Sequence, residues 1–436
     1  MPVSVLESAP PLEAWFPGFA RRRHCVWIDG DSGGGGAGWS VLACDPVEVR
    51  RGAEADLPGW MDETADRLRG SDDHGLPFAG GLIGRVDYLG ELPGYPPEAR
   101  PAPDGWLGLY DRALVAHLPS GRIHAVLGGW VPGGRAELES WIRGLAPAAP
   151  PERAAVRSAE RPVSNMGPEE YRAGVRTIRE WIAAGDIYQA NLARRFGCRA
   201  GGLRPEEVYL ALRRANPAPY SAYLDCGDCR ILSSSPELFL AVDAGGSVRT
   251  RPIKGTRPRS GDPVRDRELA RLLRGNEKER AELLMIVDME RSDLGRVCVP
   301  GSVRAAEDFA VESFASVHHM VGEVTGRLRP GAGWSDLFAA AFPGGSVTGA
   351  PKHRAMEIIR SLEPSPRGAF CGSIGFVSAG GGGRWNIAIR TMEWRDGVIE
   401  FGVGAGIVWD SDPAAEERET MDKARGLFAA LGWPLG

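Results

Sequence analysis

The stretch FGVGAGIVWDSDPAAEERETMDKAR, residues 401–425, decides the fold of this chain. Its first part alternates glycine with apolar residues, which is typical of a strand whose backbone other groups approach closely. Pro413 then opens a charged, periodic segment, which predicts a helix that begins at this residue. The glycines resemble a dinucleotide fingerprint, but Ile407 occupies the position of the required third glycine. We therefore expect a strand whose N–H groups at residues 404–406 face a carboxylate, followed by a helix.

Two pairs of glutamates lie three residues apart on predicted helices: Glu279 and Glu282 within 265–291, and Glu416 and Glu419 after Pro413. At this spacing both carboxylates share one helix face, and stacked negative charges are destabilising unless a cation compensates them. If the pairs meet in space, they suit Mg²⁺, which prefers oxygen ligands and needs only one or two direct carboxylates. The alternative is ordinary solvent-facing glutamates, because basic residues flank each pair. These residues are Lys278, Arg280, Arg418 and Lys423.

The segment PIKGTR, residues 252–257, places Lys254 between an isoleucine and a glycine at a predicted strand end. A lysine in a partly desolvated pocket can act as a nucleophile rather than only as a charge. Taken alone, the segment is better explained as a solvated cation in a basic surface loop. The residues found elsewhere along the chain must decide between the two interpretations.

Composition excludes several classes of protein. The chain has 436 residues, 43% of them hydrophobic, which is enough for a sizeable core in two or three domains or one large intertwined domain. A net charge of −5 with both signs mixed argues against nucleic-acid and membrane-surface partners. The first residues lack a signal-peptide pattern, and the sequence contains no apolar run of about 18 residues that could span a bilayer. We expect a soluble, cytoplasmic protein.

Seven cysteines at scattered positions argue against a disulfide framework and suit a reducing compartment. Cys226 and Cys229 form a single CxxC motif, and no second pair follows at zinc spacing. We interpret them as structural thiols rather than as a metal or redox site.

The chain divides into three regions by composition. Residues 1–143 hold short apolar runs separated by Gly and Pro, which is typical of antiparallel strands and turns. Residues 144–166 form an Ala- and Pro-rich connection that we expect to be exposed. Residues 167–434 are denser in motifs, and their periodicity predicts helices over 168–184 and 265–291.

Two other motifs carry weaker signals. FPGGSVTGAPK, residues 342–352, resembles a phosphate loop but lacks the Lys-Ser or Lys-Thr that should follow Gly349. The planar fork of Arg390 suits a carboxylate, although a structural arginine explains this residue equally well. The sequence contains neither a GxSxG elbow nor an HExxH zinc motif.

Taken together, these segments resemble the chorismate-utilising synthases. The strings that carry the resemblance are PIKGTRPR, KERAELLMIVDMERSDLGRV, FPGGSVTGAPKHRAMEII, CGSIGF and GAGIVWDSDPAAEERETMDKAR. The match runs from about Glu169 to Leu431, and WSVLACDP and GGLIG nearer the N-terminus are similar more weakly. The resemblance implies an α/β (α+β) protein with the anthranilate synthase component I fold. In that fold, two intertwined subdomains of antiparallel sheets have helices packed outside.

The resemblance also implies roles for individual residues. Mg²⁺ would be held directly by Glu282 and Glu419, and through water by Glu279 and Glu416, where it binds the ring carboxylate of chorismate. Glu237 matches the general acid that protonates the departing hydroxyl, because bare hydroxide is a poor leaving group. The other matches are to substrate contacts and to an active-site histidine: Gly255, Thr256, Arg390, Gly404, Ala405, Gly406 and His319.

Lys254 and Gln189 indicate one branch of this family. In the aminodeoxychorismate branch, which leads to p-aminobenzoate and folate, the lysine adds to C2 of the ring as the C4 hydroxyl leaves, and ammonia then attacks C4. The anthranilate branch has alanine in its place. Gln189 stands where the water-using branches carry a lysine base, which ammonia does not need. Two alternatives stay open: an anthranilate or 2-amino-2-deoxyisochorismate synthase, and a non-catalytic chorismate-binding subunit.

Two departures from the family pattern affect the substrate site. Phe370 stands where the family usually has a tyrosine that hydrogen-bonds the substrate, and Trp385 occupies a stretch that is usually smaller and more polar. The chain also lacks a cysteine in the GxCxG setting of a glutaminase. The resemblance therefore implies that ammonia comes from a separate glutamine amidotransferase subunit or from solution.

Overall fold

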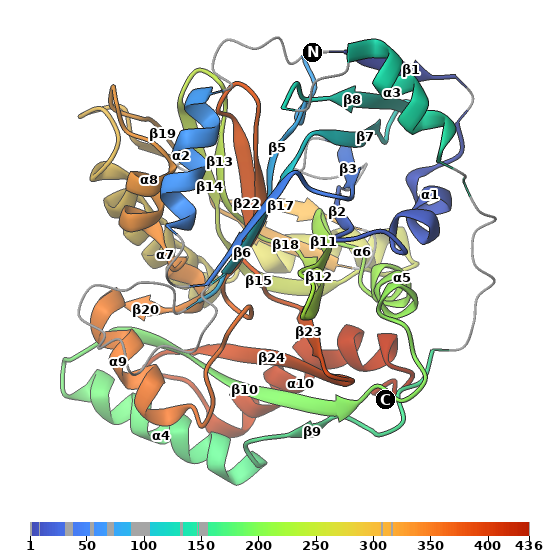
Figure 1. The fold of residues 1–436 in the computed structure, drawn as a ribbon. Coiled ribbons are helices and arrows are strands. Elements are labelled where there is room, and N and C mark those ends of the chain that lie inside the picture. The colour runs from blue at the N-terminus through green and yellow to red at the C-terminus, as the bar shows by residue number, and fades with distance from the viewer. Residues whose placement is uncertain are drawn as a thin grey trace.

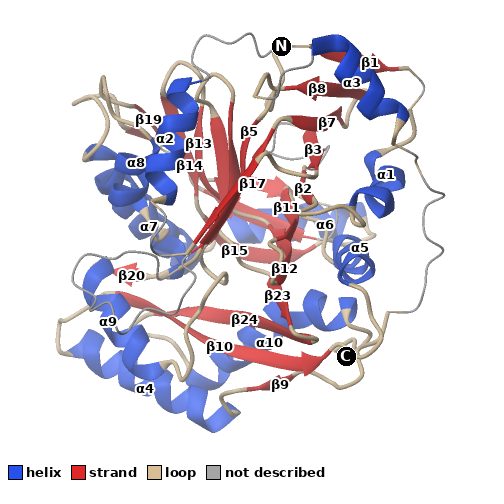
Figure 2. Cartoon of the chain, viewed as in Figure 1, coloured by secondary structure: helices blue, strands red, loops and turns tan. Residues whose placement is uncertain are grey.

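The computed structural model describes residues 2–7, 9–30, 38–52, 56–67, 74–88, 105–130, 134–145, 147, 156–306, 308–314 and 317–435 (Figure 1). Much of the predicted Ala- and Pro-rich connection, residues 146 and 148–155, lies outside the described residues. Strands fill the interior of the molecule and helices lie on its outside (Figure 2). The predicted mixture of antiparallel sheets with external helices is confirmed.

One sheet combines strands from both ends of the chain. Its spatial order is β1 (Val3–Leu6), β8 (Arg122–Leu127), β7 (Arg112–His117), β3 (Trp39–Ala43), β2 (Val26–Asp29), β11 (Tyr220–Asp225), β12 (Cys229–Ser235), β23 (Thr391–Arg395), β24 (Val398–Ile407), β10 (Gln189–Arg199) and β20 (Gly349–Ala350). The short β9 (Val163–Ser164) pairs with β10. Strands β2 and β11 pair with Asp29 opposite Ser221, so the N-terminal and C-terminal regions share one sheet.

A second sheet crosses the first and is also built from both regions. Its order is β16 (Arg304–Ala305), β19 (Val324–Arg327), β14 (Ser247–Arg251), β13 (Leu238–Val242), β22 (Gly383–Asn386), β21 (Ser373–Ser378), β5 (Gly81–Val86), β6 (Gly105–Tyr110) and β4 (Glu48–Arg51). A small third sheet has the order β15 (Ile253–Pro258), β18 (Val317–Val321) and β17 (Ala310–Ser313). The chain passes directly from β12 through Pro236 and Glu237 into β13, and from β14 through Pro252 into β15.

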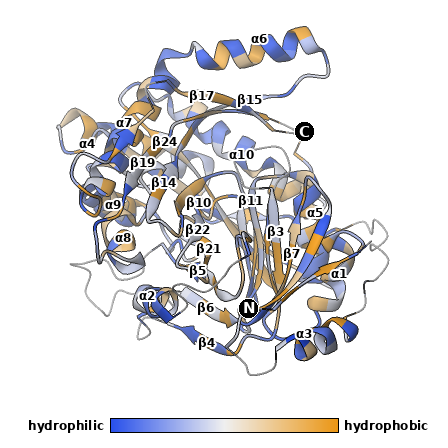
Figure 3. Cartoon of the chain, turned by 90° about the horizontal axis from the view of Figure 1, so that it is seen from above, coloured by the Kyte–Doolittle hydropathy of each residue, from blue (hydrophilic) through white to orange (hydrophobic). Residues whose placement is uncertain are grey.

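Apolar side chains of the first two sheets pack against each other to form one part of the core. Ile28 and Ala222 of the first sheet belong to the same buried cluster as Ile83, Trp106 and Phe376 of the second. Apolar residues are concentrated in these strands, whereas the outer helices carry hydrophilic faces (Figure 3). Burial of alternate strand residues against a facing sheet therefore joins the two halves of the chain.

Helices cover the outer faces of the sheets. Their bounds are α1 (Leu12–Phe19), α2 (Leu57–Arg67), α3 (Gly134–Arg143), α4 (Pro168–Ala183), α5 (Pro205–Ala215), α6 (Pro263–Arg274), α7 (Glu277–Gly295), α8 (Trp334–Ala341), α9 (Lys352–Leu362) and α10 (Pro413–Ala430). Helix α10 begins where the sequence predicts, because Pro413 is its first residue and the Asp412 carboxylate accepts the Ala415 N–H at 2.8 Å. Helices α4, α5 and α10 pack together beside β24.

The helix predicted over residues 265–291 is wrong in one respect, because two helices cover this stretch. Helix α6 ends before Gly275, and α7 begins after Asn276, whose side chain accepts the Glu279 N–H at 3.0 Å. Gly275 ends the first helix and Asn276 caps the second, which is the usual preference of these residues. The turn aims α7, with its two glutamates, at β15 while α6 lies outside β15 and β18 (Figure 3).

A search of the described helices for a membrane-spanning segment found none that is both long enough and apolar enough.

Candidate active site

The candidate catalytic residues meet where the three sheets adjoin. Lys254 lies on β15, Gln189 begins β10, and Glu237 lies in the connection between β12 and β13. Residue 406 on β24 brings two of them together: a Cβ there would lie 2.7 Å from Lys254 Nζ and 2.7 Å from Gln189 Nε2. The missing side chain at this position leaves room for both polar groups, and any Cβ there would displace the ends of both side chains.

Gln189 is buried, and among the described residues neither its Oε1 nor its Nε2 has a hydrogen-bond partner. Leaving a buried amide unpaired costs about 1–3 kcal/mol, so such groups usually serve a ligand or an ordered water. His319 Nε2 is unpaired in the same way, whereas the Ser346 hydroxyl lies beside the Glu237 carboxyl. These unpaired atoms indicate a polar site around Lys254 and Glu237 that a ligand completes.

Lys254 is tied to helix α7 through its ion pair with Glu282, with 3.8 Å between Nζ and Oε2. Glu279, one turn earlier, accepts two hydrogen bonds from the Arg257 guanidinium, at 2.9 and 3.3 Å. Gly255 lies between these contacts with a φ of +79°, and a Cβ there would approach Glu279 Oε2 to 3.0 Å. Its left-handed backbone produces the bulge that carries β15 past the helix.

Helix α10 supplies the other glutamate pair. Glu419 is bound by Lys423 at 2.7 Å, and the same Nζ donates to the Gly404 carbonyl oxygen at 2.8 Å. Glu416 accepts the Ser411 hydroxyl at 2.7 Å. Lys423 lowers the pKa of Glu419, whereas burial raises the pKa of Glu416. Lys423 therefore binds both a candidate metal ligand, Glu419, and the backbone of the glycine-rich strand β24.

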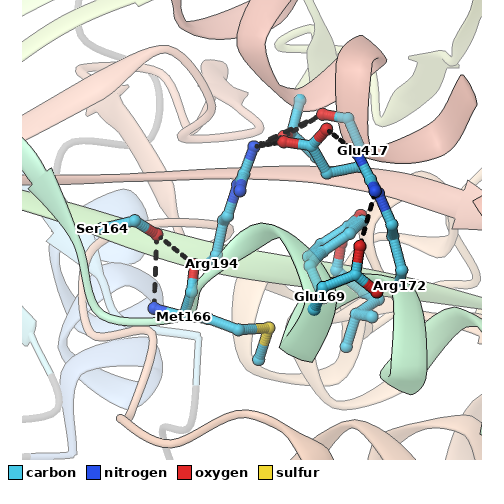
Figure 4. A network of polar contacts seen from close by, with 9 residues as sticks. Ser164, Met166, Glu169, Arg172, Arg194 and Glu417 are labelled. Carbon is cyan, nitrogen blue, oxygen red and sulfur yellow. Dashed lines mark hydrogen bonds and ion pairs between the residues drawn. The ribbon is translucent and has the colours of Figure 1, made fainter. Parts of the chain in front are cut away.

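A buried network fixes the rotation of α10 against the sheet (Figure 4). Arg194 of β10 donates to Glu417 Oε1 at 2.8 Å and to Thr420 Oγ1 at 2.6 Å. Arg172 of α4 reaches Glu417 Oε2 at 3.4 Å and is itself held by Glu169 at 2.6 Å. Glu417 faces this network. Glu416, one residue earlier, and Glu419, two residues later, therefore lie on other sides of the helix.

The four glutamates fit a magnesium site only in part. Within the described residues, no group of three or more His, Cys, Asp or Glu side chains is arranged to hold a metal ion by itself. Glu282 and Glu419 lie close enough for each charge to act on the other, and burial followed by this repulsion helps raise the pKa of Glu282. Glu279 and Glu416 face Arg257 and Ser411 instead. Two carboxylates within electrostatic reach suit an ion that takes its other ligands from substrate and water.

Glu237 has the properties of a buried acid. Its carboxyl is almost fully buried, and Oε1 accepts the Ile253 N–H at 3.4 Å. Burial raises the pKa of Glu237 to about 7, while the nearby Ser346 hydroxyl and the Lys254 charge oppose this rise. A substantial fraction of the carboxyl is therefore protonated near neutral pH, as a general acid requires.

His319 and Arg390 add two further polar side chains to the candidate site. His319 Nδ1 lies 2.9 Å from the Thr256 hydroxyl on the adjacent strand. Burial, reinforced by the Arg390 charge, lowers the pKa of His319 to about 3, so the imidazole is neutral. Arg390 has a φ of +51°, donates to Asn216 Oδ1 at 3.3 Å, and has its pKa lowered by burial to about 10. A half-buried guanidinium that donates to a neutral amide is suited to an anionic ligand.

The two departures noted in the sequence have different structural settings. Trp385 is fully buried and packs edge-on against Phe338 with 5.3 Å between ring centroids, so it belongs to the core. Phe370 lies against the glycine strand: a Cβ at residue 402 would come within 2.3 Å of its ring. Phe370 therefore contributes packing beneath the site and no hydroxyl group.

Sequence reasoning missed several residues of this site. Ser346 lies in the FPGGSVTGAPK segment, which carries part of the family resemblance but does not by itself indicate a role for this serine. Lys423 was weighed only as a neutralising base, although it also bonds the backbone of β24. Glu290 is a further buried carboxyl; it accepts the Thr250 hydroxyl at 2.8 Å, and burial raises its pKa well above the usual range. The sequence signal that could have identified Glu290 was its position on the same predicted helix as Glu282.

Comparisons with known proteins agree on the family. The profile of the family described as chorismate binding enzyme matches residues 38–429. Aminodeoxychorismate synthase component 1 of Salmonella typhimurium is 43% identical over 364 residues, which cover 82% of this chain and 78% of that protein. Anthranilate synthase component 1 of Streptomyces coelicolor is 48% identical over 269 residues, covering 62% of this chain and 52% of that protein. The crystal structure of anthranilate synthase component I from Streptococcus pneumoniae superposes with a TM-score of 0.76 at 32% identity, covering 90% and 92% of the two chains.

Proposed function

The chain belongs to the chorismate-binding enzymes, and on this premise we propose that it is an aminodeoxychorismate synthase component 1, which converts chorismate and ammonia to 4-amino-4-deoxychorismate. The observation that carries the proposal is the placement of Lys254 Nζ and Gln189 Nε2 around the one position where a side chain of residue 406 would begin, with 2.7 Å between each atom and a Cβ there. Amination with ammonia uses a lysine nucleophile and needs no base at residue 189, where a neutral glutamine suffices. Hydration would need a base at residue 189 to activate water.

Loss of the C4 hydroxyl needs an acid. Glu237 protonates the departing oxygen, so that water leaves in place of hydroxide. Its support is the pKa of about 7 that burial gives this carboxyl. A carboxyl with an ordinary pKa would be almost wholly ionised at neutral pH and could donate no proton.

Lys254 adds through Nζ to C2 of the ring while the C4–O bond breaks, and ammonia then attacks C4 and expels the lysine. This order needs an uncrowded approach to Nζ, which the absence of a side chain at residue 406 supports. Gln189 cannot take a proton from water as a lysine could. Its unpaired amide instead offers hydrogen bonds to the neutral nucleophile or to the substrate.

We propose that Mg²⁺ is held by Glu282 and Glu419, with Glu279 and Glu416 acting through water. When bound, the ion would neutralise the ring carboxylate of chorismate and withdraw electron density from it. The support is that burial together with the charge of Glu419 raises the pKa of Glu282, an effect that a cation would offset. Arg390 and the strand at residues 404–406 hold the substrate carboxylates.

Ammonia comes in this proposal from a separate glutamine amidotransferase subunit. The name component 1, which the aminodeoxychorismate relatives carry, implies a partner component. The proposal is tested by incubating the purified chain with chorismate, ammonium and Mg²⁺, and by converting the product with a lyase to p-aminobenzoate. Anthranilate or isochorismate as the main product would overturn the branch assignment.

A further inference from the structure

A pair of thiols lies at the tip of the hairpin formed by β11 and β12. These strands pair with Asp225 opposite Arg230, so the next residues, Cys226 and Cys229, lie opposite each other across a two-residue turn. The Cys226 N–H donates to the Cys229 carbonyl oxygen at 3.0 Å. Directly opposed residues of antiparallel strands have Cα atoms about 4.5–5.5 Å apart, which is within the range that a disulfide spans.

One buried cation faces this pair. Arg85 of β5 is only 2% exposed, and its Nη2 donates to Cys229 Sγ at 3.7 Å. Its Nη1 pairs with Asp87, whereas its Nε has no partner among the described residues. A guanidinium beside a sulfur stabilises the thiolate. The hydrogen bond from the Cys226 thiol, followed by the Arg85 charge, lowers the pKa of Cys229, while burial raises that of Cys226.

The chain contains a second opposed pair for comparison. Strands β2 and β3 pair with Val26 opposite Ala43, which makes Cys25 and Cys44 the next opposed residues. Both are as buried as the hairpin thiols. Burial raises the pKa of both, that of Cys44 to about 12. Both pairs are therefore opposed in register, and they differ in thiolate stabilisation.

We propose that Cys226 and Cys229 form a dithiol that hydrogen peroxide oxidises to an intrachain disulfide in preference to the other cysteines of the chain. The Cys229 thiolate attacks one peroxide oxygen, the O–O bond breaks, and the departing hydroxide takes a proton to become water. Cys226 sulfur then attacks the sulfenic sulfur of Cys229. The S–O bond breaks, the Cys226 proton leaves with the hydroxyl as a second water, and the disulfide remains.

The pair is buried but lies close to the surface, and its position gives the crosslink a place to act. The turn residues Gly227 and Asp228 are exposed, so the thiols lie one residue beneath the surface at the end of the hairpin. Strand β12 runs from Cys229 to Ser235 and leads, through Pro236, to Glu237. A disulfide closes the hairpin at the far end of the strand that precedes this residue. This inference does not depend on the proposed function, because its test measures cysteine alkylation and peptide mass and not enzyme activity.

The test uses the reduced full-length chain, treated with hydrogen peroxide for increasing times, alkylated, digested and analysed by mass spectrometry. We expect the peptide that holds Cys226 and Cys229 to lose two hydrogen atoms and to escape alkylation. It should do so at least severalfold faster than the Cys25 and Cys44 peptides react, because the Arg85 guanidinium lies beside the Cys229 sulfur. Equal rates for the two pairs, or continued alkylation of Cys226 and Cys229 in folded protein, would overturn the proposal.

Three variants separate the contributions. Cys226→Ser should leave Cys229 as a sulfenic acid that dimedone traps, whereas Cys25→Ser with Cys44→Ser should leave the disulfide yield unchanged. Arg85→Lys should slow oxidation severalfold, because an ammonium does not present the same fork to sulfur. An undiminished rate in a folded Arg85→Lys chain would remove the guanidinium from the explanation, and the unmodified chain still tests the dithiol if that variant fails to fold.

Discussion

Lys254 Nζ lies 3.8 Å from Glu282 Oε2, and both side chains are largely buried, at 14% and 17% exposed. The candidate nucleophile and the candidate metal ligand are thus ion-pair partners. A divalent cation that binds Glu282 competes with Lys254 for the same carboxylate. Binding of that cation would therefore weaken the ion pair that holds Lys254.

Replacement of Lys254 tests the covalent step. We expect Lys254→Ala to lower kcat for aminodeoxychorismate formation at least about a thousandfold, in the range found when one member of a catalytic group is removed. Lys254→Arg is the matched control, because it keeps a positive charge beside Glu282 but lacks the amine nucleophile. Single-turnover assays with chorismate and ammonium distinguish the two. Substantial activity in Lys254→Arg would reduce the lysine to an electrostatic role.

Removal of magnesium tests the paired carboxylates. Chelation by EDTA should abolish product formation, and excess Mg²⁺ should restore it. Glu282→Gln should raise the Mg²⁺ concentration for half-maximal activity by at least about tenfold, because a direct ligand matters no less than an outer one. The control is Glu180→Gln, an exposed glutamate of α4. Full activity of the unmodified chain after exhaustive chelation would show that no metal is required.

Substitution at residue 406 tests the close approach of Lys254 and Gln189. Gly406→Ala introduces a Cβ 2.7 Å from both Nζ and Nε2, so both side chains must move. A displacement near 1 Å at a reacting group costs about a hundredfold, and we expect kcat/KM to fall by that order. Gly202→Ala is the control, since a Cβ there meets no atom within 4 Å. Equal kinetics for the two variants would contradict the geometry of the site.

The sequence singled out individual residues that the fold brings close together, but it did not predict their contacts. Lys254, Gln189 and Glu237 were identified from motifs, and the start of α10 from Pro413. The approach of Gly406 to Lys254 could not be foreseen, because it depends on the meeting of two sheets that are distant in sequence. The break at Gly275 was missed because apolar periodicity continues on both sides of it, and one glycine in a periodic segment is weak evidence of a helix end.

The buried ion pair beneath α10 should dominate its stability. Arg194 and Glu417 are only 2% and 11% exposed, so Glu417→Ala leaves an unpaired buried guanidinium and should cost about 3–5 kcal/mol. Glu139→Ala breaks the exposed pair with Arg135, at 46% and 76% exposed, and should cost at most about 1 kcal/mol. Urea denaturation followed by circular dichroism measures both. A cost for Glu417→Ala no larger than that for Glu139→Ala would refute this account of how α10 is held.

The raised pKa of Glu237 predicts two pH dependences. Activity needs the protonated acid, so kcat/KM at constant free ammonia should fall as pH rises through about 7. The folded pKa lies above the unfolded value, so the folded state binds the extra proton, and this contribution to stability is complete below about pH 4 and disappears as pH rises through about 7. Glu237→Gln should therefore lower kcat about 10²- to 10⁴-fold and flatten this part of the stability profile. If Glu237→Gln kept its activity and still lost activity as pH rises through about 7, the proton would belong to another group. Buried Glu290 on α7 is a candidate for that group.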